Sequence, residues 1–373
     1  MKRFIADHSA LLLLAALCVA LGWYLPEFRM VDNLQIVALR AAMLGMVALG
    51  GLLVMITGGI DLSVGGVAAL AGVAGCLSML RVQTWLSSAW VHGWIIKLPH
   101  SMEPYLTNGL FPALVFASGI VVGILLGFGC GLVNGLLCAK GRRVRSIIIT
   151  LCMMGAARGL VMVIPQQPPM SDPPKLFAWL GGPQAWWVPV AIACQLGGVF
   201  AVMLAYTQFG RNLYAVGGNA EGSRLSGIPV GRTRLKAFVL SGTVAGLAGM
   251  VLASGTGAAS PDAAGLFELD AIAACVIGGA SLAGGVGGAI TVLVGALVLA
   301  MLYNFCSIKG LSPDWQKVLL GALLVSLVCY DNWRQRRAGI VKEQCGMSKL
   351  PCIQHGVHQK SRRLAAPEGP DNR

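Results

Sequence analysis

Two segments of the chain place acidic side chains next to glycines inside otherwise apolar sequence. In the first, Asp61 is followed two residues later by Ser63. In the second, Glu268 and Asp270 open an apolar stretch that is rich in glycine, with Gly278, Gly279, Gly284, Gly285, Gly287 and Gly288. A carboxylate at the centre of a membrane-spanning helix costs about 2.5–3.5 kcal/mol on insertion scales, so it normally faces a cavity or a partner. Asp61, Ser63, Glu268 and Asp270 are therefore candidates to line, brace or gate a path for a polar solute.

Each acidic segment also has a purely structural interpretation. Asp61 would cap the N-terminus of a helix that starts at the membrane surface, where the cost of its charge largely disappears. The glycines after Asp270 permit a broken or re-entrant backbone, which lipid tolerates only where it is buried in protein or lines water. They suit a closely packed turn between two helices equally well. From the sequence alone, both pairs of interpretations stay open.

A third segment, 209–229, has polar residues in the order expected for a short exposed helix. Asn219 is a good N-cap, Glu221 suits the positive end of the helix dipole, and Gly227 is a natural residue to follow the last turn. We therefore predict a helix over 220–226, in a loop whose candidate functional residues are Gly218, Asn219, Glu221, Arg224, Leu225 and Gly227. Such a helix either docks a partner or merely connects two spans, and its shape alone favours the connector.

Nucleotide hydrolysis and metal chemistry are not expected in this chain. The Gly-x-x-x-x-Gly-Lys-Ser/Thr pattern of phosphate-binding loops does not occur in the sequence. The 11 cysteines are scattered, mostly in or beside apolar stretches, where cysteine behaves as a small hydrophobic residue. Near the C-terminus, the spacing of Cys345, Cys352, His355 and His358 fits no strong zinc pattern. We expect a chain that is not an enzyme and that holds no cofactor or metal.

The composition predicts an all-α integral membrane protein as the scaffold for these segments. Hydrophobic residues make up 56% of the 373 residues and charged residues 12%, whereas soluble domains carry about 25% charged residues. The net charge of +13 does not indicate nucleic-acid binding, because the basic residues fall between apolar runs. Runs long enough to cross a bilayer predict about ten spans, at 9–25, 35–56, 62–80, 111–138, 146–164, 187–206, 236–254, 269–283, 287–303 and 315–331.

The basic residues between the apolar runs predict how the spans are oriented. With the N-terminus inside, Lys2 and Arg3 fall on the same side as the basic clusters within 140–145, 211–236 and 334–337. Cytoplasmic loops carry the excess of lysine and arginine. We therefore expect both the N-terminus and the C-terminus in the cytoplasm.

The two ends of the chain differ in composition. Residues 1–25 begin with basic residues and then turn apolar, but no small-x-small cleavage pattern follows Leu25, so we favour an uncleaved first span over a signal peptide. The transmembrane domain is expected to cover 1–335. The remaining stretch, 336–373, is polar and lacks the apolar content to fold alone, which predicts a disordered cytoplasmic tail.

Glycines recur every fourth residue in the run 111–138, at Gly123, Gly127, Gly131 and Gly135. On a helix this spacing stacks them into one ridge, which lets a neighbouring backbone approach closely. Packing against another helix of the same chain is favoured over an interface between subunits.

Taken together, the motifs resemble those of the permease subunits of ribose- and xylose-type carbohydrate-uptake ABC importers. The similar strings are Gly59-Ile60-Asp61-Leu62-Ser63-Val64-Gly65, the loop Phe209–Pro229, and Glu268-Leu269-Asp270-Ala271-Ile272-Ala273-Ala274 with the glycines that follow. The similarity covers roughly residues 34–335 and keeps the order and spacing of the motifs.

The resemblance implies a multi-pass permease of the inner (plasma) membrane that moves a monosaccharide, such as a pentose, into the cell. It implies a cytoplasmic ATP-binding subunit, an extracytoplasmic sugar-binding protein and a second permease subunit, in a homodimer, as partners. The helix over 220–226 then couples the ATPase to the spans, so the docking interpretation outweighs the connector. The alternative is a self-contained, ion-coupled secondary transporter, in which Asp61, Arg40, Arg158 and Asp270 relay protons or ions.

Overall fold

The computed structural model describes residues 9–88, 106–140, 146–164, 173–256 and 265–337. Within these ranges it contains helices and turns and no β-strand, which agrees with the all-α prediction. The chain divides into two compact units, Met1–Leu327 and Val328–Arg373. The tail predicted at 336–373 lies outside the described residues, apart from its first two.

Seven of the described helices are long and apolar enough to cross a membrane. They are α3 (Val31–Ile56), α4 (Val64–Leu86), α7 (Phe111–Lys140), α8 (Ser146–Val163), α10 (Trp187–Tyr206), α13 (Val230–Thr256) and α15 (Ala289–Ile308). Each of them coincides with a run that the sequence predicts to be a span. The helices therefore agree with an integral membrane protein, while the total of about ten spans stays a prediction.

The other three predicted spans correspond to shorter or more polar helices. α2 (Ser9–Tyr24) has 16 residues, and α16 (Pro313–Arg337) ends in charged residues. α14 (Phe267–Ile277) has only 11 residues, so the helix predicted at 269–283 is shorter than expected. At 1.5 Å per residue it is about 16 Å long, roughly half the thickness of the hydrocarbon core. The helix ends before Gly279, whose φ of +86° is a left-handed conformation that glycine adopts without strain.

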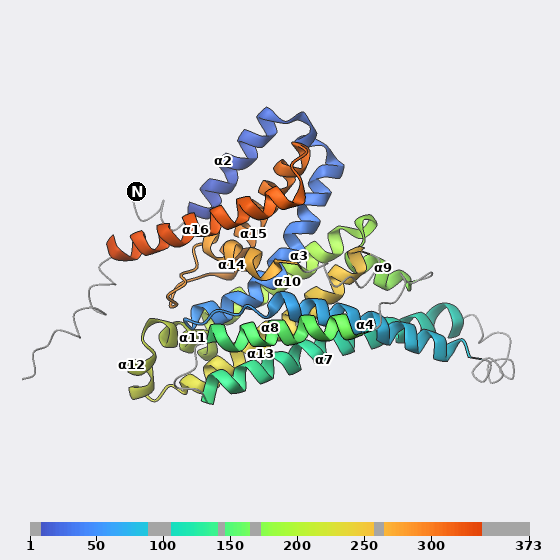
Figure 1. The fold of residues 1–373 in the computed structure, drawn as a ribbon, viewed down its shortest axis with the longest axis horizontal. Coiled ribbons are helices and arrows are strands. Elements are labelled where there is room, and N and C mark those ends of the chain that lie inside the picture. The colour runs from blue at the N-terminus through green and yellow to red at the C-terminus, as the bar shows by residue number, and fades with distance from the viewer. Residues whose placement is uncertain (1–8, 89–105, 141–145, 165–172, 257–264, 338–373) are drawn as a thin grey trace, which may run out of the picture. The chain divides into compact units, whose positions relative to one another are not determined.

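Helices α4, α7, α8 and α13 run side by side (Figure 1), and the most extensive helix contact in the structure joins α7 to α13. The glycine ridge of α7 forms this contact. A methyl group added at Gly127 would lie 2.9 Å from both the backbone nitrogen and the Cα of Gly246, and closer still to the carbonyl oxygen of Gly242. The ridge therefore packs within the chain, which confirms the favoured interpretation.

Helix α3 lies at the centre of the packing, in contact with α10, α13, α14 and α15. Its side chains Met46, Leu49, Leu52 and Leu53 are fully enclosed. Two irregular segments interrupt the helices that meet here. The first break, residues 57–63, separates α3 from α4, and the second break, residues 278–288, separates α14 from α15.

Shorter helices connect the long ones. They are η1 (Pro26–Arg29), η2 (Leu106–Leu110), α9 (Lys175–Gly181), η3 (Pro183–Ala185), α11 (Gln208–Gly218) and α12 (Ala220–Leu225). The sequence predicts α12 but not α11. Helix α11 starts at an N-cap, Thr207, whose hydroxyl accepts a hydrogen bond of 3.1 Å from the Gly210 amide, and its residues Leu213 and Val216 are buried.

Candidate functional site

Asp61 lies in the first break and is buried, with 5% of its surface exposed. Its Oδ1 accepts hydrogen bonds from the amide of Ser63 at 3.0 Å and from the hydroxyl of Ser63 at 2.6 Å. Its Oδ2 accepts a third, at 2.9 Å, from the hydroxyl of Ser241 on α13. The amide group of Asn134 on α7 donates to the Ser63 hydroxyl at 2.9 Å. The carboxylate thus ties the first break to both α7 and α13.

The cap proposed for Asp61 is not what the structure shows. Helix α4 begins at Val64, and its N-cap residue is Ser63, with no side-chain cap bond. Asp61 instead accepts the Ser63 amide, one residue outside the helix. Sequence reasoning missed Ser241 as a partner, because Thr243 and Ser254 in the same apolar run offer equivalent hydroxyls.

Glu268 and Asp270 lie in the first turn of α14 and are both buried. Arg158 on α8 donates from its guanidinium to Oε1 of Glu268 at 2.7 Å. The other oxygen, Oε2, has no hydrogen-bond partner among the described residues and packs against Gly65, where a side chain larger than hydrogen would overlap it. Glycine at position 65 is therefore what lets the α14 carboxylate approach the start of α4.

Asp270 belongs to a different polar cluster. It accepts a short hydrogen bond from the hydroxyl of Tyr303 on α15, and the guanidinium of Arg40 on α3 lies over the Tyr303 ring, 4.3 Å from its centre. A cation over an aromatic face is favourable, and more so when both groups are withdrawn from water. The cluster joins α3, α14 and α15. The four predicted path residues are therefore all buried, but they are distributed over separate groups of partners.

The second break is irregular backbone that is mostly half-buried, with Ala283 and Val286 exposed. Gly279, Gly284, Gly285 and Gly287 have φ values of +86°, +93°, +75° and +153°, which side-chain-bearing residues rarely adopt. The amide of Gly285 donates a hydrogen bond of 2.9 Å to the carbonyl oxygen of Ile56, the last residue of α3. This contact favours a broken segment that docks on another helix end over a simple turn between two full spans.

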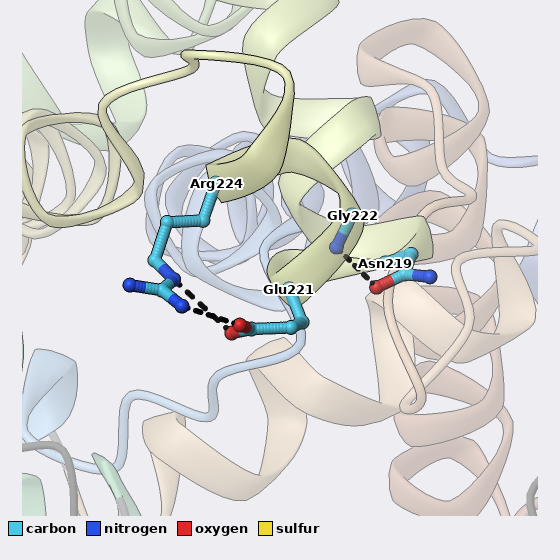
Figure 2. A network of polar contacts seen from close by, with 4 residues as sticks. All are labelled: Asn219, Glu221, Gly222 and Arg224. Atoms are coloured by element: carbon cyan, nitrogen blue, oxygen red, sulfur yellow. Dashed lines mark hydrogen bonds and ion pairs between the residues drawn. The ribbon is translucent and has the colours of Figure 1, made fainter.

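The short helix α12 is capped at both ends, and Figure 2 shows the cap at its N-terminus. Oδ1 of Asn219 accepts a hydrogen bond from the Gly222 amide at 2.8 Å. At the other end, Gly227 has a φ of +81°, its amide donates to Arg224, and the amide of Ile228 donates to Ser223. These are the paired bonds of a glycine-terminated helix. The structure therefore confirms the predicted helix, which ends at Leu225.

The outer face of α12 carries an ion pair and an apolar side chain. Arg224 donates to the two carboxylate oxygens of Glu221 at 2.5 and 3.2 Å (Figure 2), and both side chains are more than half exposed. Leu225 is 78% exposed. Water screens an exposed pair of this kind, and pairing costs both side chains freedom of movement, so its contribution to folding is small.

Among the residues that the structure describes, no group of three or more histidine, cysteine or acidic side chains is placed to hold a metal ion. The zinc pattern considered near the C-terminus lies outside the described residues.

Comparison with known proteins gives consistent matches along the chain. The family described as "Branched-chain amino acid transport system / permease component" matches residues 33–328. The L-arabinose transport system permease protein AraH of Escherichia coli (strain K12) is 35% identical over 336 residues, 88% of this chain and 92% of that protein. The ribose import permease protein RbsC of the same strain is 33% identical over 342 residues, 90% of this chain and 96% of that protein.

A further relative carries the transporter class in its name. The L-arabinose ABC transporter permease protein AraH of Azospirillum brasilense is 33% identical over 340 residues, 90% of this chain and 91% of that protein. No solved structure gives a significant match to the chain.

Proposed function

The chain belongs to the permease family of ribose- and arabinose-type ABC importers, and we propose that it is the sugar-translocating membrane subunit of such an importer. The resemblance inferred from the sequence motifs is thereby confirmed. The observation that carries the proposal is similarity to sugar permeases over nearly the whole length of both chains. The family description names branched-chain amino acids, but these relatives are named for arabinose and ribose, which favours a pentose or a similar monosaccharide.

The chain is a permease component and not an enzyme, because its relatives are permease subunits. Hydrolysis of ATP therefore falls to a separate ATP-binding subunit. An extracytoplasmic sugar-binding protein would deliver the sugar, and a second copy of the permease would complete the membrane unit. The alternative of a self-contained, ion-coupled transporter is not favoured, since a relative covering 90% of this chain is an ABC transporter permease.

In our proposed topology the chain crosses the inner membrane about ten times, with both termini in the cytoplasm. The seven long helices supply most of the crossings, and α2, α16 and α14 with the second break supply the others. The end of the molecule that carries α11, α12 and the start of α13 faces the cytoplasm in this topology. Its basic residues support that side, namely Arg211, Arg224, Arg232, Arg234 and Lys236.

We assign α12 as the docking element for the ATP-binding subunit. It presents Glu221, Arg224 and Leu225 outward, and it is held by caps at both ends rather than by a buried core of its own. A short helix with this exposure can move as a unit when a partner binds it. Gly218, Asn219 and Gly227 delimit the element and set its direction.

We assign the two breaks, with Asp61, Ser63, Glu268 and Asp270, to the walls or gate of the sugar path. Arg158 supports a path near Glu268, because its side chain is 40% exposed on an otherwise apolar helix. A charged side chain within a span needs water or a protein partner rather than lipid. The face of α8 that bears Arg158 therefore borders the path, which the second permease copy would complete.

The test is reconstitution of the permease in vesicles with its ATP-binding subunit and binding protein, followed by a screen of pentoses and hexoses. We expect one of these sugars, presented with the binding protein, to stimulate ATP hydrolysis and to accumulate inside. Leucine serves as the control for the amino-acid description of the family. Uptake by the permease alone under an ion gradient, or stimulation by leucine and by none of the sugars, would contradict the proposal.

A further inference from the structure

Three segments that are far apart in the sequence meet at one place built almost entirely from backbone. They are the end of α3, the last turn of α11, and the second break. Besides the bond from Gly285 to Ile56, a methyl group at Gly284 would lie 2.7 Å from the amide nitrogen of Gly58. One at Gly217 would overlap both Ile56 and Gly285. We call Ile56, Gly58, Gly217, Gly284 and Gly285 the glycine junction.

One side chain links α11 to the second break beside the glycine junction. The hydroxyl of Tyr214 donates a hydrogen bond of 2.7 Å to the carbonyl oxygen of Gly287. Burial raises the pKa of Tyr214 above its usual value, so the hydroxyl stays protonated and able to donate at neutral pH. The bond spans two elements that are 73 positions apart in the sequence. It therefore adds a side-chain link between α11 and the second break beside the close backbone contacts.

Helix α11 lies between the exposed α12 and the two breaks. On one side, Asn219 alone separates α11 from α12. On the other side, Leu213 and Val216 are buried and α11 contacts α3, α10 and α13. Helix α12 itself contacts α11 and α13. Of these two neighbours, α11 is the one whose hydrogen bond and close backbone contacts reach the second break.

We propose that α11 carries the movement of α12 to both breaks through the glycine junction, and that Tyr214 is the positioning residue that engages the second break. Gly58 lies in the first break, three residues before Asp61. The second break directly follows α14, the helix that bears Glu268 and Asp270. Because glycines leave no side chain between the backbones, a displacement of α11 cannot be absorbed by rotamer changes. This inference rests on the proposed function, since it assumes that an ATPase acts on α12.

The test uses Tyr214→Phe in the full reconstituted importer, with Tyr206→Phe as the matched control. The first substitution removes the hydroxyl from a half-buried ring, and the second removes one from a ring that is 79% exposed. The measurements are the sugar-stimulated rate of ATP hydrolysis, the sugar taken up per ATP hydrolysed, and the melting temperature of each purified permease. We expect Tyr214→Phe to keep most of the hydrolysis and to lower uptake per ATP by about 2- to 10-fold, the range that one hydrogen bond supports.

Several outcomes would overturn the inference. If Tyr214→Phe leaves uptake per ATP unchanged, the hydroxyl does not position the second break. If hydrolysis and uptake fall together at a constant ratio, or if Tyr206→Phe produces the same loss, the effect lies in folding or docking rather than in transmission. If the unaltered importer shows no sugar-stimulated hydrolysis, the proposed function itself fails, and this result is distinguishable because it precedes any substitution.

Discussion

The packing of α7 on α13 predicts that alanine substitutions at two glycines of α7 have opposite effects on stability. At Gly127 an added methyl group would meet the backbone of Gly242 and Gly246, whereas at Gly129 it would meet no heavy atom within 4 Å. Both lie in the interior of α7, so replacing either by alanine brings the same gain in helix propensity, about 1 kcal/mol. The difference between Gly127→Ala and Gly129→Ala therefore isolates the cost of the close helix approach.

The size of that difference follows from the geometry at Gly246. The added Cβ would lie 2.9 Å from two backbone atoms of Gly246, and backbone cannot rotate away as a side chain end can. The two helices would have to move apart along their contact, because the added Cβ would also overlap the carbonyl oxygen of Gly242. Overpacking of this kind costs about 1–3 kcal/mol. One kcal/mol shifts the melting temperature by about 2–4 °C in chains of 150–250 residues and by less in a chain of 373, so we expect Gly127→Ala to melt a few degrees, and at most about 12 °C, below Gly129→Ala.

Thermal unfolding of the two purified variants in the same detergent, followed by tryptophan fluorescence, measures this gap. The unaltered protein provides the reference, and Gly129→Ala is expected to match or exceed it. Equal melting temperatures for the two alanine variants would refute the reasoning, because they would mean that α7 and α13 do not touch through the glycine ridge.

Two further substitutions test the cap of α12 and the brace of the first break. Asn219→Ala removes the acceptor for the Gly222 amide and should cost about 1 kcal/mol of helix stability. We expect this loss to lower the sugar-stimulated rate of ATP hydrolysis in the reconstituted importer. Asn219→Asp keeps the acceptor and should retain the rate. Asp61→Ala strands the buried donors of Ser63 and Ser241, at about 1–3 kcal/mol each, and should lower the melting temperature of the permease by several degrees. An unchanged melting temperature would show that the carboxylate does not brace the break.

The sequence predicted those elements whose signals are local. The caps of α12 could be read from Asn219 and Gly227 because capping depends on residues within one turn. The long spans could be predicted because an apolar run of about 20 residues matches the thickness of the hydrocarbon core of a bilayer. Helix α11 was missed although Phe209, Leu213 and Val216 stand at the i, i+4, i+7 spacing of one helix face.

The partners of the buried acidic residues could not be predicted for a different reason. Ser241 lies 180 positions from Asp61, and Arg158 lies 110 positions from Glu268. Such pairs depend on how the spans pack, and periodicity within one span carries no information about the helix opposite. The end of α14 at Ile277 could not be predicted for the same reason. The glycines after it permit a break, but the hydrogen bond from Gly285 to Ile56 that holds the broken segment joins residues far apart in the sequence.

The four candidate path residues, Asp61, Ser63, Glu268 and Asp270, have different hydrogen-bond partners, which suit them to different roles. Asp61 has a hydrogen bond on each carboxylate oxygen and Ser63 is held on both sides, so these two are suited to bracing the first break. Asp270 is engaged by Tyr303 inside the cluster with Arg40. Glu268 is paired with Arg158, whose side chain is 40% exposed, and Arg40 beside Asp270 is exposed as well. A sugar on the proposed path would therefore meet these two exposed arginines before any of the buried carboxylates, and Glu268 would act through the arginine that it holds.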